Sequence, residues 1–217
     1  MIKWFVTNTL VLNLYKTSIM KFMTRNTSQS TLQIGYKEKY LEEAANTKFL
    51  GLQCDNHVNF KNHIEQIIPK VSEACHAIRS MDHISNMNTL KSIYYAYFHS
   101  VIKYGIIFWG NCSNSQKIFT LQKKIVRIVA GVKPRTSCRS LFKQLEIQPV
   151  PCQYILSLMK CIISNQENFQ INSSVCNINS RNKHHFHTKC YSVLLSKCIL
   201  CGIKVFNSLP QSSRITK

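Results

Sequence analysis

The sequence predicts an α+β fold in which a small β-sheet at the N-terminal end precedes a mainly helical bundle. Two patterns lead to this prediction. Up to about residue 60, apolar residues form short runs or alternate with polar ones, as they do in strands. Beyond that point they recur every three or four residues, as they do along one face of a helix. Hydrophobic residues make up 45% of the 217, which is enough for a packed core.

The strands are expected within residues 1–59. Met1 to Tyr15 fits the end of a helix packed on a sheet, and Lys16 to Met23 alternates as a half-buried strand does. Thr24 to Ser30 is polar and predicts a turn. Two further strands are expected, joined by the charged connection KEKYLEEAANT, at Thr31 to Tyr36 and at Phe49 to Asp55.

A first long helix is predicted between Phe60 and Met81. Its apolar residues form one stripe, namely Ile64, Ile67, Ile68, Val71, Cys75 and Ile78. Its polar face carries Lys61, Glu65, Lys70, Glu73 and Arg79. A second helix is predicted through Leu90, Ile93, Tyr94, Tyr97 and Val101 to Gly105, with Asn88 or Thr89 as its N-cap.

A third helix is predicted from about Ser115 to a stop at Gly131. Its inner face comprises Ile118, Leu121, Ile125, Val126 and Val129, and its outer face carries Lys117, Lys123, Lys124 and Arg127. A short helix is expected at Ser137 to Leu145. After Pro149 and Pro151, a fifth helix is striped by Tyr154, Ile155, Leu158, Met159 and Ile162.

The remaining sequence changes character. Asn165 to Lys183 is rich in Asn, Ser and Gln and predicts a loop or linker. Lys189 to Lys217 supports no structural prediction. We therefore expect three regions: a sheet-containing region at 1–59, a helical domain at 60–164, and a linker with a poorly defined segment at 165–217.

The charge points to a polyanionic partner. The chain has 28 Lys and Arg against 9 Asp and Glu, a net charge of +19. Such an excess repels itself in a compact state, and binding RNA, DNA or an RNA/DNA hybrid would offset it and release counterions. The alternative is a basic protein without such a partner. A membrane is not expected, because no apolar run approaches the ~20 residues of a span and no amphipathic helix gathers the cations.

Apart from Cys198 and Cys201, the ten cysteines are scattered without paired spacing, which favours free thiols in a reducing, intracellular compartment, nuclear or cytoplasmic, over a secreted disulfide scaffold. A zinc site is an alternative interpretation of His184, His185, His187, Cys190, Cys198 and Cys201. Structural zinc sites generally use two closely spaced ligand pairs, and only Cys198 and Cys201 form one here. We therefore predict no metal site.

Five segments stand out in order along the chain, among them LNLYKTSIMKF and FLGLQCD with the helix that follows it. Together they resemble the reverse transcriptase of non-LTR (LINE-type, jockey-like) retrotransposons. The segments cover Leu12 to Phe22, Phe49 to Met81, Leu90 to Asn111, Leu121 to Ile155 and Gly202 to Pro210. The resemblance implies an RNA-directed DNA polymerase fold, with part of the palm and its primer grip in residues 1–59 and a thumb-like bundle in residues 60–164.

The resemblance also implies where catalysis would reside. In that family, an Ala-Asp-Asp turn and a further aspartate hold two magnesium ions upstream of the first resembling segment, and this chain begins at Met1 after both. Only Asp55 and Asp82 are present, unpaired. We therefore expect a downstream piece without catalytic residues, bound cofactor or small-molecule substrate. Lys16 corresponds to a lysine near the incoming nucleotide; the alternative is an exposed lysine before a strand.

Two groups are expected to contact nucleic acid. The primer-grip resemblance selects Phe49, Leu50, Gly51 and Leu52, where the glycine would permit close backbone approach; an ordinary buried strand is the alternative. The densest basic group comprises Lys117, Lys123, Lys124, Arg127, Lys133, Arg135 and Arg139, suited to sequence-independent phosphate contacts. The spacing of Tyr94, Tyr95, Tyr97, Phe98 and Trp109 favours core packing over base stacking.

The expected function is thus binding of RNA or an RNA/DNA hybrid by a reverse transcriptase fragment. Two alternatives remain open. The chain is a remnant of a mobile element with no specific activity, or it is part of a complete reverse transcriptase split by the gene model.

Overall fold

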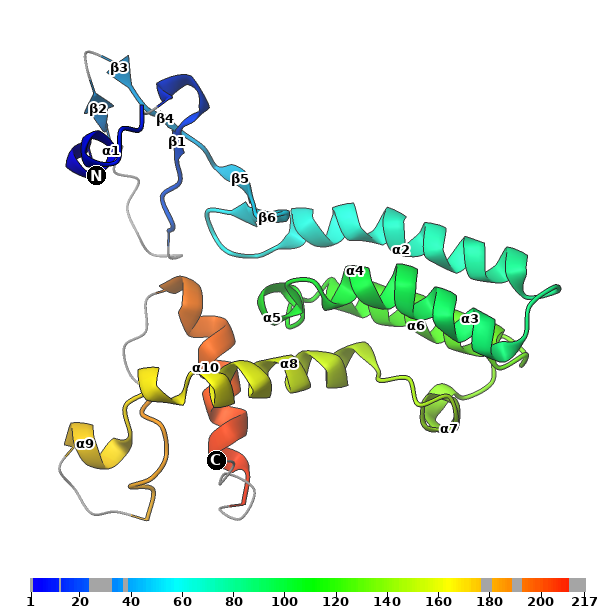
Figure 1. Ribbon diagram of the computed structural model, residues 1–217. Helices are drawn as coiled ribbons and strands as arrows, with labels where there is room; N and C mark the ends of the chain where they lie inside the picture. The colour runs from blue at the N-terminus through cyan, green and yellow to red at the C-terminus, as the bar shows by residue number, and fades with distance from the viewer. Residues whose placement is uncertain are drawn as a thin grey trace. The chain divides into compact units, whose positions relative to one another are not determined.

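The structure is a computed structural model that describes residues 2–11, 13–23, 33–36, 39–176, 181–188 and 193–210. The chain divides into two compact units, residues 1–59 and 60–217. Short strands occur in the first unit, and helices make up most of the second (Figure 1). The mixed α+β class predicted from the sequence is confirmed.

The first unit contains short elements only. A helix, α1 (Ile2–Thr7), and a single 3-10 turn, η1 (Leu14–Lys16), precede the strands. The strands are β1 (Ser18–Ile19), β2 (Gly35–Tyr36), β3 (Lys39–Tyr40), β4 (Glu42–Glu43), β5 (Asn46–Phe49) and β6 (Leu52–Asp55). They pair two by two: β1 with β4 in parallel, and β2 with β3 and β5 with β6 antiparallel.

The predicted strand from Phe49 to Asp55 is wrong, because a tight turn divides it. Phe49 pairs with Leu52 across the hairpin of β5 and β6, so the turn consists of Leu50 and Gly51. Both have positive φ, 46° and 83°, as the hairpin turn that matches strand twist requires. A leucine in that conformation is unusual, so the apolar run concealed the turn.

The other predictions for this unit are only partly correct. The helix at the N-terminus is six residues long and leaves Trp4 and Val6 exposed, so it does not pack on a sheet through them. Between Lys16 and Met23 only Ser18–Ile19 is a strand, and the charged connection contains β3 and β4. Two-stranded pairs of this size bury too little to form one sheet. The turn predicted at Thr24 to Ser30 lies outside the described residues.

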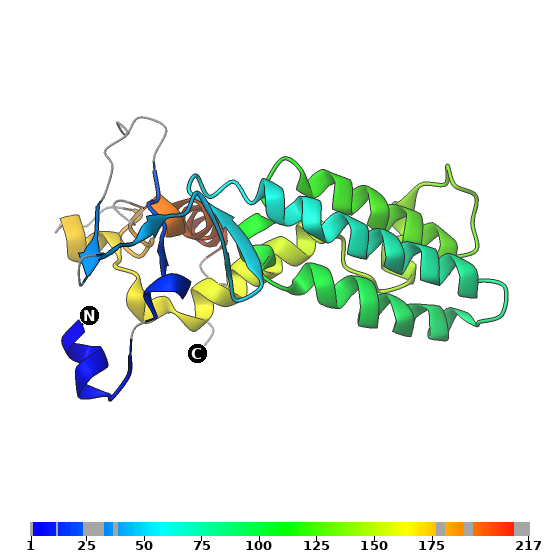
Figure 2. The same ribbon diagram turned by 90° about the horizontal axis from the view of Figure 1, so that it is seen from above.

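In the second unit, the longer helices of the bundle lie side by side (Figures 1 and 2). The helices of the bundle are α2 (Lys61–Met81), α3 (Met87–Ile93), η2 (Tyr94–His99), α4 (Ser100–Lys103), α5 (Ile106–Trp109), α6 (Ser115–Val129), α7 (Cys138–Gln144) and α8 (Val150–Ser164). α2 packs along α6 and η2, and α8 packs against α5 and α6. The predicted stripes form the core: Ile64, Ile78, Ile118 and Ile125 are fully buried.

The second predicted helix is continuous from α3 through α4 but contains a π-helical stretch, η2. At its end the Ser100 N–H bonds the carbonyl of Tyr95, five residues back. The buried residues Leu90, Tyr94, Phe98 and Ile102 repeat every four residues. In an α-helix that repeat drifts by about 40° per step. A π turn holds more residues and reverses the drift, so all four side chains stay on the core face.

The helix ends follow from local chemistry. The side chain of Asn86 accepts a hydrogen bond from the Thr89 N–H at 2.9 Å, so Asn86 caps α3, rather than the predicted Asn88 or Thr89. At the end of α6, the Gly131 N–H bonds Ile128 and the Val132 N–H bonds Arg127. This is a Schellman motif with glycine at positive φ, which confirms the predicted stop.

The described residues after Ser164 contain short helices within the predicted loop or linker and one longer helix in the segment for which no structural prediction was made. They include η3 (Gln166–Asn168), α9 (Asn172–Cys176) and α10 (Val193–Ser208). Ile203 and Phe206 of α10 form a buried cluster with Ile162 of α8 and with Phe186. The Asn207 side chain bonds both the N–H and the carbonyl of Phe186, each at 3.0 Å. These contacts attach α10 to the bundle.

Among the described helices, none combines the length and the apolar character needed to cross a bilayer. The eight cysteines whose side chains the structure describes are free thiols.

Candidate nucleic-acid interface

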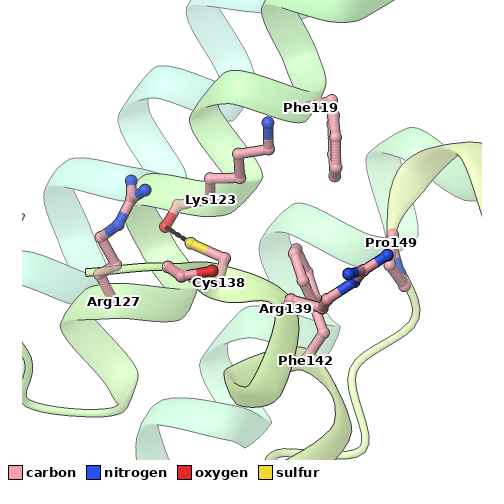
Figure 3. Close-up of a pocket in the computed structure, with 8 residues that line it drawn as sticks. Phe119, Lys123, Arg127, Cys138, Arg139, Phe142 and Pro149 are labelled. Carbon is pink, nitrogen blue, oxygen red and sulfur yellow. Dashed lines mark hydrogen bonds between the residues drawn. The ribbon is translucent and has the colours of Figure 1, made fainter. Parts of the chain in front are cut away.

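A cavity of about 470 Å³ lies between α6, α7 and the start of α8 (Figure 3). Its lining combines three cations with two phenylalanine rings: Phe119, Lys123, Arg127, Ser137, Cys138, Arg139, Phe142 and Pro149. Three of the seven cations in the predicted basic group are therefore brought together. We refer to this hollow as the basic cavity.

Helix geometry places the first two cations. Lys123 and Arg127 are four residues apart on α6, so they project from the same face one turn apart. The Lys123 ammonium lies 4.2 Å from the centroid of the Phe119 ring, a cation–π contact that orients it beside the cavity. Figure 3 shows Arg139 extending from α7 toward Pro149.

The loop between α6 and α7 is held in place by the same residues. The Nε of Arg127 donates to the carbonyl of Thr136 at 2.8 Å, leaving its terminal nitrogens available. The buried thiol of Cys138 lies 3.6 Å from the carbonyl of Lys123, its acceptor on α6. Together with the Gly131 turn, these bonds direct the chain back so that α7, which carries Arg139, packs against α6.

The floor of the cavity is aromatic. The rings of Phe119 and Phe142 are stacked, with centroids 6.1 Å apart and planes inclined by 21°. Phe142 is buried and Phe119 is half-buried, so one ring remains accessible at the edge. Between Ser115 and Leu145 the sequence contains eight Lys and Arg and no Asp or Glu. The site can therefore attract a phosphate and offer a ring surface beside it.

The other four predicted cations do not line the basic cavity. Burial raises the pKa of the Cys75 thiol on α2, and Arg79 and Lys124 oppose that shift. Lys124 is thus near α2, on a different side of α6 from Lys123. Lys117 is exposed near the start of α6, and Lys133 and Arg135 are exposed on the following loop.

The predicted primer-grip residues occupy the tip of the β5–β6 hairpin in the first unit. Phe49 and Leu50 are 64% and 73% exposed, whereas Leu52 is buried. Lys16 is exposed at the end of η1, where its backbone N–H lies 3.3 Å from the Asn13 side-chain oxygen. The structure thus presents Phe49 and Leu50 at a surface loop, not within a buried strand.

Several lining residues were not predicted. Phe119, Ser137, Cys138, Phe142 and Pro149 carry no charge to draw attention to them. One signal was available for the rings, because Phe119 is four residues before Lys123 and Phe142 is three after Arg139, which is same-face spacing on a helix.

The predicted aromatic core is largely confirmed. Tyr94, Phe98 and Trp109 are fully buried, whereas Tyr95 and Tyr97 are 40% and 63% exposed.

The two aspartates have local roles. Asp55 ends β6 and its carboxylate accepts the Asn59 N–H at 2.7 Å, and Asp82 follows α2. Within the described residues, no three metal-ligating side chains come together. His187 bonds the Asn172 side chain at 3.0 Å, and Cys201 accepts from Asn111. The side chains of Cys190 and Cys198 lie outside the described residues.

Comparisons with protein-family models, with curated proteins and with solved structures find no match to this chain.

Proposed function

We propose that the protein binds nucleic acid, RNA or an RNA/DNA hybrid, through the basic cavity and the exposed cations around it. One observation carries the proposal. Lys123, Arg127 and Arg139, from two helices, line one hollow that no carboxylate lines, beside a half-buried phenylalanine ring. A solvated charged face would not require stacked rings or a cavity.

The mode of binding follows from the side chains present. Lysine and arginine contacts to phosphate do not depend on base sequence, so the affinity should be general and sensitive to salt. Three such contacts to a duplex give a slope of log affinity against log salt of about −3. The net charge of +19 adds a long-range attraction that speeds encounter.

We further propose that this binding belongs to a reverse transcriptase of the non-LTR type. The five resembling segments support that assignment, with the second unit in the role of the thumb and the first in that of part of the palm. In that role the chain holds primer and template, and the magnesium chemistry belongs to the complete family enzyme. The competing proposal is a mobile-element remnant that binds nothing specifically.

The test is a titration of the full chain with a labelled RNA/DNA hybrid at two salt concentrations. The Lys123→Gln/Arg139→Gln variant should bind at least tenfold more weakly at low salt, with a salt slope reduced by about 2. The matched control is Lys61→Gln/Lys70→Gln, which removes the same charge from the exposed face of α2. An equal loss in both variants, or no binding by the wild type at low salt, would overturn the proposal.

A further inference from the structure

A second cavity, of about 300 Å³, lies on the other side of the connection between α7 and α8. Tyr95 and His99 come from the π-helical stretch η2, and Gln153 and Ser157 come from α8. Lys103 and Lys160 are exposed at its edge. None of these residues lines the basic cavity, so the two sites are separate.

One wall of this second cavity is fixed in place. The Tyr95 hydroxyl donates to the carbonyl of Glu146 at 3.3 Å, and its ring packs edge-on against the His99 imidazole, with centroids 5.2 Å apart. Glu146 has φ of 56°, a left-handed conformation that is strained for a non-glycine residue. The Tyr95 hydrogen bond helps to hold this strained turn at the cavity wall.

Gln153 is the informative residue. Its side chain is only 6% exposed, yet no described residue forms a hydrogen bond with its amide group. Gln122, the other buried glutamine of the bundle, makes three such bonds. The Gln153 amide is not sealed in the core, so it is open to the cavity and can be reached by water there. A ligand in the cavity could therefore bond this amide in place of water.

The charges limit the class of ligand. Burial lowers the pKa of the His99 imidazole, and Lys103 lowers it further, so the ring is neutral at pH 7. The interior is therefore polar and uncharged. The charged lining residues, Lys103, Lys160 and Glu146, are all exposed at the edge, and the two cations against one carboxylate favour an anion there. A ligand that matches has a planar polar part and one anionic group.

We propose that this second cavity binds a single nucleotide. The Gln153 amide, which can donate and accept at once, contacts the edge of the base, as glutamine does with nucleobases elsewhere. Ser157 adds a hydroxyl beside it, and Lys103 and Lys160 contact the phosphate. The volume is at the lower end of the range of ligand sites, which suits one nucleotide and excludes a duplex. This goes beyond the expectation, drawn from the sequence, that no small ligand is bound.

The nucleotide can be free or can be an unpaired residue of a bound strand. The experiment therefore has two arms, both with the full chain. In the first, each of the four ribonucleoside 5′-monophosphates, and inorganic phosphate, is titrated by calorimetry. In the second, an RNA/DNA hybrid with one unpaired nucleotide is compared with a fully paired one.

The key variant is Gln153→Leu, which keeps the volume and removes the amide. This variant should lower the affinity for the monophosphate, or the preference for the unpaired nucleotide, at least tenfold. Its urea midpoint should stay the same or rise. Lys61→Gln/Lys70→Gln, on the exposed face of α2, serves as the control and should leave both unchanged. A wild type that shows neither monophosphate binding nor a preference overturns the proposal. The proposal is also overturned if inorganic phosphate binds as tightly as every monophosphate, or if Gln153→Leu binds the monophosphates as the wild type does. A loss of binding in the control variant alone would overturn it as well.

Failure here is distinguishable from failure of the proposed function, because Gln153→Leu should bind a fully paired hybrid as the wild type does.

Discussion

The side-chain amide of Gln122, fully buried in α6, donates a hydrogen bond to the equally buried hydroxyl of Tyr94 at 2.9 Å. The same nitrogen donates to the carbonyl of Gln148 at 2.8 Å, and the amide oxygen accepts the Val150 N–H at 2.8 Å. Burial raises the pKa of the Tyr94 hydroxyl, which remains protonated. Gln122 thus connects η2 with the start of α8.

This relationship has a consequence for both cavities. The backbone that Gln122 holds, Gln148 to Val150, separates them, since Gln148 lines the second cavity and Pro149 lines the basic cavity.

We expect Gln122→Leu to lower the free energy of unfolding by about 3 kcal/mol, because it leaves buried donors and acceptors of three partners unsatisfied. Urea denaturation followed by circular dichroism measures this change. Gln116→Leu, at an exposed position of the same helix, should change stability by less than about 0.5 kcal/mol. A similar small effect for both variants would show that the three hydrogen bonds do not stabilise the fold.

We expect Gly110→Ala to be destabilising by about 1–3 kcal/mol, because the added methyl group would overlap the ring of Tyr154 and the carbonyl of Ile106. Thermal unfolding is a suitable measurement. The comparison is Gly131→Asn, where nothing lies within 4 Å of the added Cβ atom and asparagine tolerates the positive φ. The prediction fails if Gly110→Ala is the better tolerated of the two.

Stability should depend on pH between 7 and 5. Burial lowers the pKa of His63 and His99, assisted by Lys70 and Lys103, so the folded state favours neutral imidazoles. The unfolded chain binds protons first, near pH 6.5. The stabilisation is therefore complete above about that pH and is lost as pH falls through it toward the lower pKa values of the folded state.

The measurement is the urea midpoint at half-unit steps of pH. His63→Phe should reduce the slope below pH 6.5, whereas His76→Gln, on the exposed side of α2, should retain it. A wild-type midpoint that is constant from pH 7 to 5 would contradict this origin of the pH dependence.

We expect Ile203→Ala to cost about 2–5 kcal/mol, as is usual for truncation of a fully buried isoleucine. Unfolding is followed by near-ultraviolet and far-ultraviolet circular dichroism, which report tertiary packing and helix content. The two transitions should coincide, since Ile203 packs with Ile162 and Phe186. Lys204→Ala, one residue along and exposed, is the control. Two separate transitions would indicate that α10 unfolds independently of the bundle.

The helices were predictable because their apolar stripes are long and regular. The third helix, predicted from Ser115 to Gly131, is Ser115–Val129, and the short fourth one is Cys138–Gln144. Most of the strands were not predictable, because a strand of two residues carries almost no periodic signal. At the β5–β6 turn, tertiary structure imposes a positive φ on Leu50 that its residue type disfavours.

The candidate site was predictable only in its charges. The density of cations in the sequence was enough to select Lys123, Arg127 and Arg139. That the three line one cavity depends on the path of the loop after Gly131, which the sequence does not show. Gln122 and Gln153 lie on the buried faces of α6 and α8, among apolar neighbours. Position on such a face reveals that an amide is buried, but it does not reveal whether partners are present, because those come from distant segments.

The π-helical stretch from Tyr94 to His99 also sets the rotational phase between the two ends of its helix. It accommodates one residue more than a regular α-helix would, so deletion of a single residue there restores an unbroken pattern of bonds four residues apart. Leu90 and Ile102 would then be about 1,100° apart, close to three full turns, so both would still face the core. The π-helical stretch is thus the place where this helix can lose one residue without turning the face of α3 that meets solvent.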